Sequence, residues 1–216
     1  MYEWDGAGPT VIILHGWGSS AARFTLLAQA LHAGGWRVLA VDAPGHGATD
    51  GHSSSLPQFM ACLDAVVEHC GKPQALVGHS LGALAIACRY AAAPPGWADG
   101  LRSVVLSSMP QGAEYLLRKF IHLLGLSAAT EQRLRARFLA RFGRQPSEYA
   151  AMPGAGRIAA RLLLLHDRSD DLIPYEHSRE LATQLPAAQF VTTEGLGHSA
   201  LTRDAATIAR IVEFLA

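Results

Sequence analysis

The chain has 216 residues, of which 50% are hydrophobic and 17% charged, and this suits one globular domain with a full core. Eighteen Lys and Arg balance eighteen Asp and Glu, which argues against a dedicated nucleic-acid binder or a polybasic membrane-surface protein. The three cysteines form no C-x-x-C pair, which argues against a disulfide scaffold or a zinc finger. No apolar run reaches the roughly 18 residues of a membrane span, and the N-terminus lacks a signal-peptide pattern. We therefore expect a cytoplasmic protein, and the absence of Asn together with the excess of Ala and Arg indicates GC-rich, bacterial coding.

Six short runs rich in Val, Ile and Leu follow one another along the chain, and most are continuous, as in strands covered on both faces. They are Thr10–His15, Arg37–Asp42, Gln74–His79, Leu101–Ser107, Arg161–His166 and Ala188–Thr193. Helical patterns lie between them, at Ala21–Ala33, Pro57–Cys70, Leu81–Ala92, Tyr175–Leu185 and Asp204–Leu215. This alternation predicts an open, mostly parallel α/β sheet of about six strands, with ligands bound beyond the carboxyl ends of the strands.

Between Met109 and Ala150 the alternation stops, and only helical patterns occur. An insertion of this size between two strands predicts a helical lid over residues 109–150, within a single domain that spans residues 1–216. Its second helical pattern carries arginines spaced four apart beside an apolar stripe; these are Arg133, Arg137 and Arg141, and Leu134, Phe138 and Phe142. We expect the arginines to face solvent while the stripe packs inward. The alternative is that the arginines attract anionic substrates.

Residues 78–82 (GHSLG) stand where a strand pattern changes into a helical pattern. A nucleophilic serine needs this arrangement, because a tight strand-to-helix turn exposes its Oγ and flanking glycines remove side chains that would clash. The helix that follows also directs free N–H groups at a developing negative charge. Ser80 is therefore the candidate nucleophile; the alternative is a glycine-rich packing turn.

The loop after the first strand, residues 15–18 (HGWG), falls on the same edge of the predicted sheet. It can aim the N–H of Trp17 at the point to which the N–H of Leu81 also points, and two such donors form an oxyanion hole. The alternative is a structural turn in which Trp17 only packs. We expect Trp17, Leu81 and Met109 to line the substrate site.

Three further loops supply candidates for a base and an orienting acid. His46 lies in residues 42–47 (DAPGHG), where Pro and Gly predict a sharp turn, and we expect it to bond the loop backbone rather than act as the base. His198 follows the last strand in a glycine-flanked loop, residues 195–199 (GLGHS), that can carry an imidazole over the sheet edge. Three carboxylates, Asp167, Asp170 and Asp171, crowd the loop after the fifth strand. A metal site there is the rival interpretation, disfavoured because no H-E-x-x-H or similar histidine cluster accompanies it.

The ordered set HGWG, DAPGHG, GHSLG, D-x-x-x-P and GLGH, spread over residues 10 to 216, resembles the α/β-hydrolase fold family. The resemblance implies a three-layer α/β-hydrolase fold with a short helical lid. It implies Ser80 as nucleophile, Asp170 as acid and His198 as base. It also implies the N–H groups of Trp17 and Leu81 as oxyanion donors.

The sequence departs from that family at three points. Asp167 stands where the family usually has Gly, which predicts a differently shaped acid loop. Only nine residues precede the first predicted strand, so the antiparallel pair that usually opens the sheet is expected to be missing. The lid is short and carries no substrate signature.

We expect a serine esterase that cleaves small carboxylic esters through an acyl-enzyme, with no metal and no cofactor. Thioesterase, lactonase, carbon–carbon bond hydrolase and perhydrolase activities use the same constellation, and the sequence leaves them open. The alternative from another class is a ligand-sensing or interaction protein that keeps the triad and turns over slowly.

Overall fold

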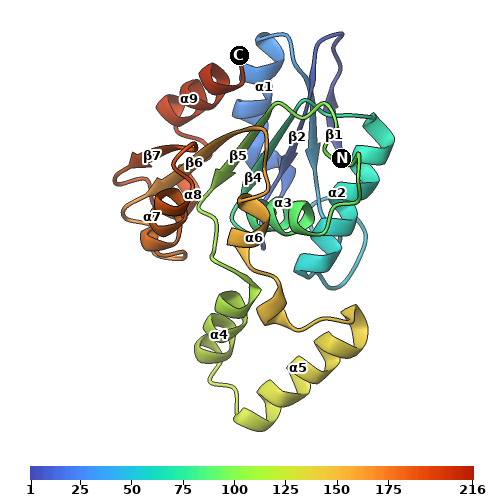
Figure 1. The fold of residues 1–216 in the computed structure, drawn as a ribbon, viewed down its shortest axis with the longest axis vertical. Coiled ribbons are helices and arrows are strands. Elements are labelled where there is room, and N and C mark those ends of the chain that lie inside the picture. Colours follow the sequence, from blue (N-terminus) through green and yellow to red (C-terminus); the bar gives the residue numbers. More distant parts are fainter.

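A computed structural model describes all residues of the chain, Met1–Ala216, and a seven-stranded sheet crosses its body (Figure 1). The strands are β1 (Tyr2–Trp4), β2 (Thr10–Leu14), β3 (Arg37–Val41), β4 (Ala75–His79), β5 (Ser103–Ser107), β6 (Arg161–Asp167) and β7 (Gln189–Thr193). Their order in the sheet is β1-β3-β2-β4-β5-β6-β7. All neighbouring pairs are parallel except β1 and β3.

The six strands expected from the sequence all form, and β1 is an additional one. It pairs antiparallel with β3, so that Tyr2 lies opposite Ala40 and Trp4 opposite Val38. The sequence predicted no strand before Thr10 and therefore missed β1, the single antiparallel strand at this edge. β1 has only three residues at an exposed edge, so it needs no continuous apolar run, and the sequence shows none.

Helices cover both faces of the sheet, and further helices form the insertion at residues 109–150. They are η1 (Ala21–Phe24), α1 (Thr25–Ala33), α2 (Leu56–Cys70), α3 (Leu81–Ala91), α4 (Ala113–Leu123), α5 (Ala128–Phe142), η2 (Pro146–Glu148), α6 (Ala151–Ala155), α7 (Tyr175–Gln184), α8 (Gly197–Ala200) and α9 (Ala205–Leu215). Several begin by simple rules. Pro57 lies in the first turn of α2, where its missing N–H costs nothing, and Asp204 caps α9 by accepting the amide of Thr207.

Alternate residues of the central strands pack into two separate hydrophobic cores, one on each face of the sheet. On β2, Val11 and Ile13 belong to the core shared with α1 and α9. Ile12 and Leu14 belong to the core shared with α2 and α3. Successive side chains of a strand point to opposite faces of the sheet, so a strand between two helical layers must be apolar at every position. This explains why the sequence shows continuous runs rather than alternation.

The chain reverses direction across the sheet at β2. It leaves β2 for β3 on one side and returns to β4 on the other. The loops that follow β2 and β4 therefore diverge at the carboxyl edge, and such a switch point is where open α/β sheets bind ligands. These two loops carry residues 15–18 and 78–82 of the sequence motifs.

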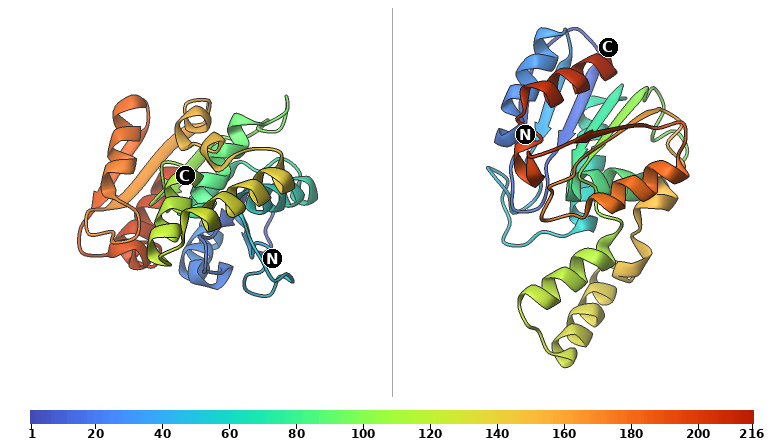
Figure 2. Two further views of the ribbon diagram at one scale, coloured as in Figure 1. Left: turned by 90° about the horizontal axis from the view of Figure 1, so that it is seen from below. Right: turned by 90° about the vertical axis from the view of Figure 1, so that its left-hand side faces the viewer.

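The insertion, residues 109–150, projects from the body as the helical pair α4 and α5 (Figures 1 and 2). Its two ends meet in an antiparallel bridge between Gly112 and Ala150. Its two helices are joined by a bidentate ion pair, in which the Arg135 guanidinium donates to both oxygens of Glu114 at 2.8 and 2.7 Å. The ion pair therefore holds the two helices of the insertion together, and the Gly112–Ala150 bridge brings the two ends of the insertion together where it joins the body.

The arginine face of α5 meets solvent, as expected from the sequence: its three arginines, Arg133, Arg137 and Arg141, are exposed. The apolar stripe is half-buried, and Phe138 packs edge-on against Tyr149 with ring centroids 5.9 Å apart. None of the helices combines the length and the hydrophobicity that a membrane-spanning segment requires.

Candidate active site

Ser80 occupies the sharp turn between β4 and α3. Its backbone has φ 53° and ψ −117°, a conformation that non-glycine residues rarely adopt. The flanking glycines make the turn sterically feasible: a Cβ at Gly78 would lie 2.6 Å from the Cα of Ala83, and a Cβ at Gly82 would lie 2.3 Å from the carbonyl oxygen of Leu14. Both glycines of the GHSLG motif are therefore required by packing.

The loop after β2 lies directly against this turn. A Cβ at Gly16 would come within 2.9 Å of the Cβ of Ser80, so the backbone that leads into Trp17 passes beside the serine. The amide of Trp17 donates no hydrogen bond within the protein. The amide of Leu81 is the first of α3 and has no acceptor in its own helix. The loop beside Ser80 and the residue after it thus each carry a backbone amide that has no acceptor in the protein.

The turn after β3 holds the loop after β2 in place. His46 accepts a hydrogen bond from the amide of Gly18 at 3.0 Å, and its other ring nitrogen lies 3.1 Å from the carbonyl oxygen of Pro44. The prediction that His46 bonds the loop backbone is confirmed. The buried carboxylate of Asp42 accepts the amides of Ala21 and Ala48, which fixes the turn from inside.

His198 and Asp170 form a close pair at the neighbouring edge of the sheet. His198 Nδ1 lies 2.8 Å from Asp170 Oδ2; the carboxylate is fully buried and the imidazole is 11% exposed. Because Nδ1 donates to the carboxylate, Nε2 carries the free lone pair that a general base needs. Asp171 is exposed, and Asp167 bonds elsewhere, so of the three carboxylates only Asp170 contacts His198.

The electrostatics of Asp170 follow from its partners. Burial alone would raise the pKa of this carboxyl group, but hydrogen bonds from His166, His198 and the amide of Ile173 outweigh burial and hold the pKa well below its usual range. His166 Nε2 lies 3.3 Å from Asp170 Oδ2, and the Ile173 amide donates to Oδ1 at 2.8 Å. These contacts therefore favour the ionised form of Asp170.

His79, inside the GHSLG motif, packs against the ring of His198. The two rings lie 4.6 Å apart between centroids, and His79 Nδ1 is 3.0 Å from the hydroxyl of Ser107. Burial and the neighbouring His198 lower the pKa of His79 well below its ordinary value. Both causes favour the neutral form of His79 beside His198.

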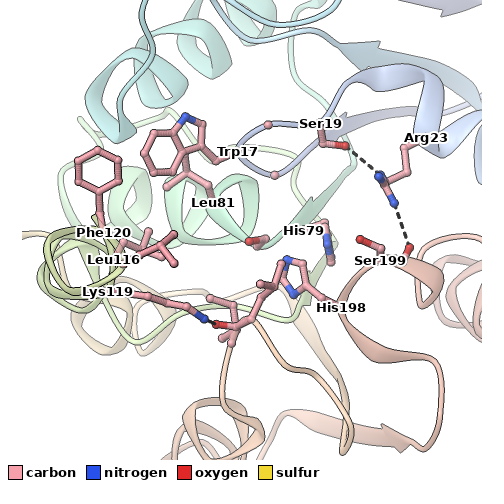
Figure 3. A pocket seen from close by; sticks show the side chains of 16 residues that line it. Trp17, Ser19, Arg23, His79, Leu81, Leu116, Lys119, Phe120, His198 and Ser199 are labelled. Atoms are coloured by element: carbon pink, nitrogen blue, oxygen red, sulfur yellow. Dashed lines mark hydrogen bonds between the residues drawn. The ribbon is translucent and has the colours of Figure 1, made fainter. Parts of the chain in front are cut away.

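Ser80 and His198 both line one open cavity of about 340 Å³. They make no hydrogen bond with each other in this structure, and catalytic hydrogen bonds are often long without substrate. Figure 3 shows an apolar side and a polar side, with His79 and His198 between them. The apolar side holds Trp17, Leu81, Leu116 and Phe120, and the polar side holds Ser19, Arg23 and Ser199.

The structure changes the predicted lining of the site. Trp17 and Leu81 line the cavity, as expected, but Met109 does not: it is only 2% exposed and packs into the core beneath the insertion. Met109 directly follows Ser108, which has an unusual positive φ of 46° at the end of β5. Sequence reasoning missed Arg23 and Lys119, which also line the cavity. No signal identified them, because they come from η1 and α4 rather than from a strand end.

No group of three or more His, Cys, Asp or Glu side chains is arranged to hold a metal ion. The carboxylates of Asp167 and Asp170 are instead occupied by hydrogen bonds from backbone amides, hydroxyls and imidazoles. The chemistry that this edge offers is that of a serine, a histidine and a buried carboxylate beside two free amides.

Comparisons with known proteins agree with this geometry. The chain matches the alpha/beta hydrolase family over residues 11–211. It is 27% identical over 230 residues to the pimeloyl-[acyl-carrier protein] methyl ester esterase of Vibrio vulnificus, covering 89% of each chain. It is also 42% identical, over a shorter stretch of 103 residues, to the pimeloyl-[acyl-carrier protein] methyl ester esterase of Chromobacterium violaceum. This match covers 47% of this chain and 37% of that one.

Among solved structures, the monoacylglycerol lipase of Paleococcus ferrophilus is similar with a TM-score of 0.73 and 26% identity, over 99% of this chain and 97% of that chain. An esterase from Exiguobacterium antarcticum shares the fold with a TM-score of 0.74 at 17% identity, over 99% of this chain and 94% of that chain. The family match alone spans most of the sequence, and the sheet order and the strand-end loops agree with it. The chain therefore belongs to the alpha/beta hydrolase family.

Proposed function

We propose that the chain is a serine esterase that cleaves small carboxylic esters through an acyl-enzyme on Ser80. The observation that carries the proposal is the bond between His198 Nδ1 and the buried Asp170 carboxylate, on the cavity that Ser80 also lines. The relatives named as methyl ester esterases support ester hydrolysis in general.

The proposed reaction has two steps. In the first, His198 Nε2 takes the proton of the Ser80 hydroxyl while Oγ attacks the ester carbonyl. The charge that develops on the carbonyl oxygen is stabilised by the amides of Trp17 and Leu81. Collapse of this intermediate breaks the bond to the alkoxy group, which leaves with the proton from His198. Acyl-Ser80 and a free alcohol result.

In the second step, water takes the place of the alcohol. His198 removes a proton from the water as its oxygen attacks the acyl carbonyl, and the same two amides stabilise the second oxyanion. Ser80 leaves and regains its proton from His198, which releases the carboxylic acid. Asp170 stays ionised throughout and stabilises the imidazolium that forms in each step.

The first test is Ser80→Ala, assayed on a short-chain aryl ester. Ser80, His198 and Asp170 are proposed to act as one catalytic unit, so removing the nucleophile should lower kcat by several orders of magnitude. Ser147→Ala is the matched control, because Ser147 is exposed and lies outside the cavity, and its kcat should stay near that of the parent protein. Retention of more than a few per cent of the activity in Ser80→Ala would overturn the proposal.

A narrower substrate is the methyl ester of an acyl group held on a carrier protein, which is what the name of the Vibrio vulnificus relative states for that protein. A panel of free esters, carrier-bound methyl esters, thioesters and lactones of graded acyl length tests it. Preference for the carrier-bound methyl ester supports the narrower substrate. Single acylation without turnover on every member of the panel would favour the ligand-sensing alternative.

A further inference from the structure

Asp167, the last residue of β6, carries a second buried carboxylate beside the proposed site. The residue is 0% exposed, and it does not contact His198. The α/β-hydrolase resemblance places a glycine at this position, so the family's mechanism assigns no side chain here. Its surroundings show what the carboxylate does in this chain.

Five hydrogen bonds converge on the two oxygens of Asp167. Oδ1 accepts the amide of Ser169 at 2.9 Å, the hydroxyl of the same residue at 2.5 Å, and the amide of Gly197 at 3.0 Å. Oδ2 accepts the hydroxyl of Thr193 at 2.7 Å and the amide of Leu196 at 3.1 Å. A carboxylate has about four lone-pair positions for such donors, so its acceptor capacity is fully used.

The donors come from two loops that each lead into a residue of the proposed triad. Ser169 directly precedes Asp170, and Gly197 directly precedes His198. The two loops are joined again by the hydroxyl of Ser169, which accepts the amide of Gly195 at 3.1 Å. One buried carboxylate therefore holds the backbone of the acid loop and the backbone of the base loop at a fixed separation.

We propose that Asp167 is a positioning residue that sets the geometry of His198 against Asp170. The proposal rests on the proposed function of that pair. Asp167 touches no reacting atom: it acts through the backbone of Leu196 and Gly197, and so decides where the imidazole of His198 stands. The glycine that the family usually has at this position cannot supply such a clamp.

The clamp depends on charge as well as shape. Burial would raise the pKa of Asp167, but the hydrogen bonds from Ser169, Thr193, Gly197 and Leu196 outweigh it and lower the pKa to about 2. An asparagine has nearly the same shape, yet in either orientation its NH₂ group would face a backbone amide that can only donate: that of Leu196 on one side, or those of Ser169 and Gly197 on the other. Such a donor–donor encounter forces one of the two loops to move.

The experiment compares Asp167→Asn with Asp171→Asn, which removes the same charge from an exposed neighbour in the same loop. We expect Asp167→Asn to lower kcat for an aryl ester on the order of 100-fold, the cost of a small misplacement of a catalytic group. KM should stay within about twofold, because the cavity walls are not changed. Asp171→Asn should keep both constants near those of the parent protein.

A spectroscopic readout separates positioning from a general loss of structure. The Nδ1 proton of His198, bonded to Asp170, should give a strongly downfield proton resonance that is absent in Asp170→Asn. In Asp167→Asn this resonance should broaden or vanish while the core amide spectrum is retained. An unchanged resonance together with an unchanged kcat would overturn the proposal.

Two further variants complete the design. If Asp167→Asn does not fold, Thr193→Val tests the positioning role instead, because it removes one hydrogen-bond donor to Asp167 and keeps the carboxylate. We expect its kcat to fall about tenfold, as for the loss of one hydrogen bond to a charged group. An unchanged kcat there overturns the clamp. Ser80→Ala is assayed alongside: its retained activity would overturn the proposed function, whereas its inactivity with a fully active Asp167→Asn overturns only the role of Asp167.

Discussion

Ser80 is held in a backbone conformation that its surroundings must enforce. Such a φ/ψ pair costs on the order of 1–3 kcal/mol, and the turn is secured by two hydrogen bonds. The Ser80 amide donates to the carbonyl of Ser107 at 2.8 Å, and the Ser80 carbonyl accepts the amide of Leu84 at 3.1 Å. The strain is therefore spread over β5 and α3, and the side chain is directed into the cavity.

At the same scale, the two neighbouring acids of the loop after β6 should differ sharply. Asp170 is buried against His198, whereas Asp171 is exposed. We expect Asp170→Asn to lower kcat/KM by about three to four orders of magnitude, since the wrong histidine tautomer then prevails. Asp171→Asn should keep kcat/KM near the parent value, and within about tenfold of it. The kcat/KM values of both variants on one ester check this, and an equal loss in the two would contradict the assignment of the acid.

The pH dependence of stability provides another residue-scale prediction. Asp167 has its pKa lowered from 3.8 to about 2 in the folded chain, so the unfolded chain binds more protons between these values. Its contribution, about 2 kcal/mol, is fully present above pH 4 and is lost as the pH falls toward 2. Urea midpoints of the parent protein and Asp167→Asn should therefore differ at pH 7 and converge near pH 2. A gap that stays constant would show that the charge of Asp167 is not stabilising.

At the scale of elements, the loops at the carboxyl edge of the sheet are held in place by hydrogen bonds between them. The turn after β3 holds the loop after β2 through His46 and Gly18, and the loop after β6 holds the loop after β7 through Asp167. The insertion joins the same network, because Tyr115 and Lys119 of α4 both donate to the carbonyl of Leu172 in the acid loop. The position of α4 over the cavity is thus tied to the loop that carries Asp170.

If α4 acts as part of a lid, its cavity-facing side chains should set acyl preference. Phe120 lines the cavity and lies 6.1 Å from Trp17 between ring centroids. We expect Phe120→Ala to raise kcat/KM for longer acyl chains relative to acetyl several-fold, because it enlarges the apolar side. Leu124→Ala is the control, since Leu124 is 53% exposed and outside the cavity. A chain-length profile shared by both variants would show that α4 does not contact the acyl group.

At the scale of the whole molecule, the elements that could be predicted are those whose burial leaves a pattern of apolar residues in the sequence. β2 through β6 are predictable because helices cover both faces of the sheet there, whereas the edge strand β7 is at most half-buried. The loops that carry Ser80, His198 and the three neighbouring carboxylates are predictable because parallel strands bring their carboxyl ends to one edge. The choice of Asp170 among those carboxylates came from the family resemblance. β1 was not predictable, since an exposed three-residue edge strand needs no apolar run. Arg23 and Lys119 reach the cavity only through the way η1 and α4 pack, which no local sequence pattern encodes.

The central claim is that Ser80 carries the acyl group between the two steps. It is tested most directly by intact-protein mass spectrometry of the chain quenched during turnover of a slowly deacylated aryl ester, followed by peptide mapping. The account predicts one acyl adduct, on the peptide that contains Ser80, which decays at the rate of acid release and is absent in Ser80→Ala. Steady turnover with no adduct, or an adduct on another residue that is released at the turnover rate, would contradict it.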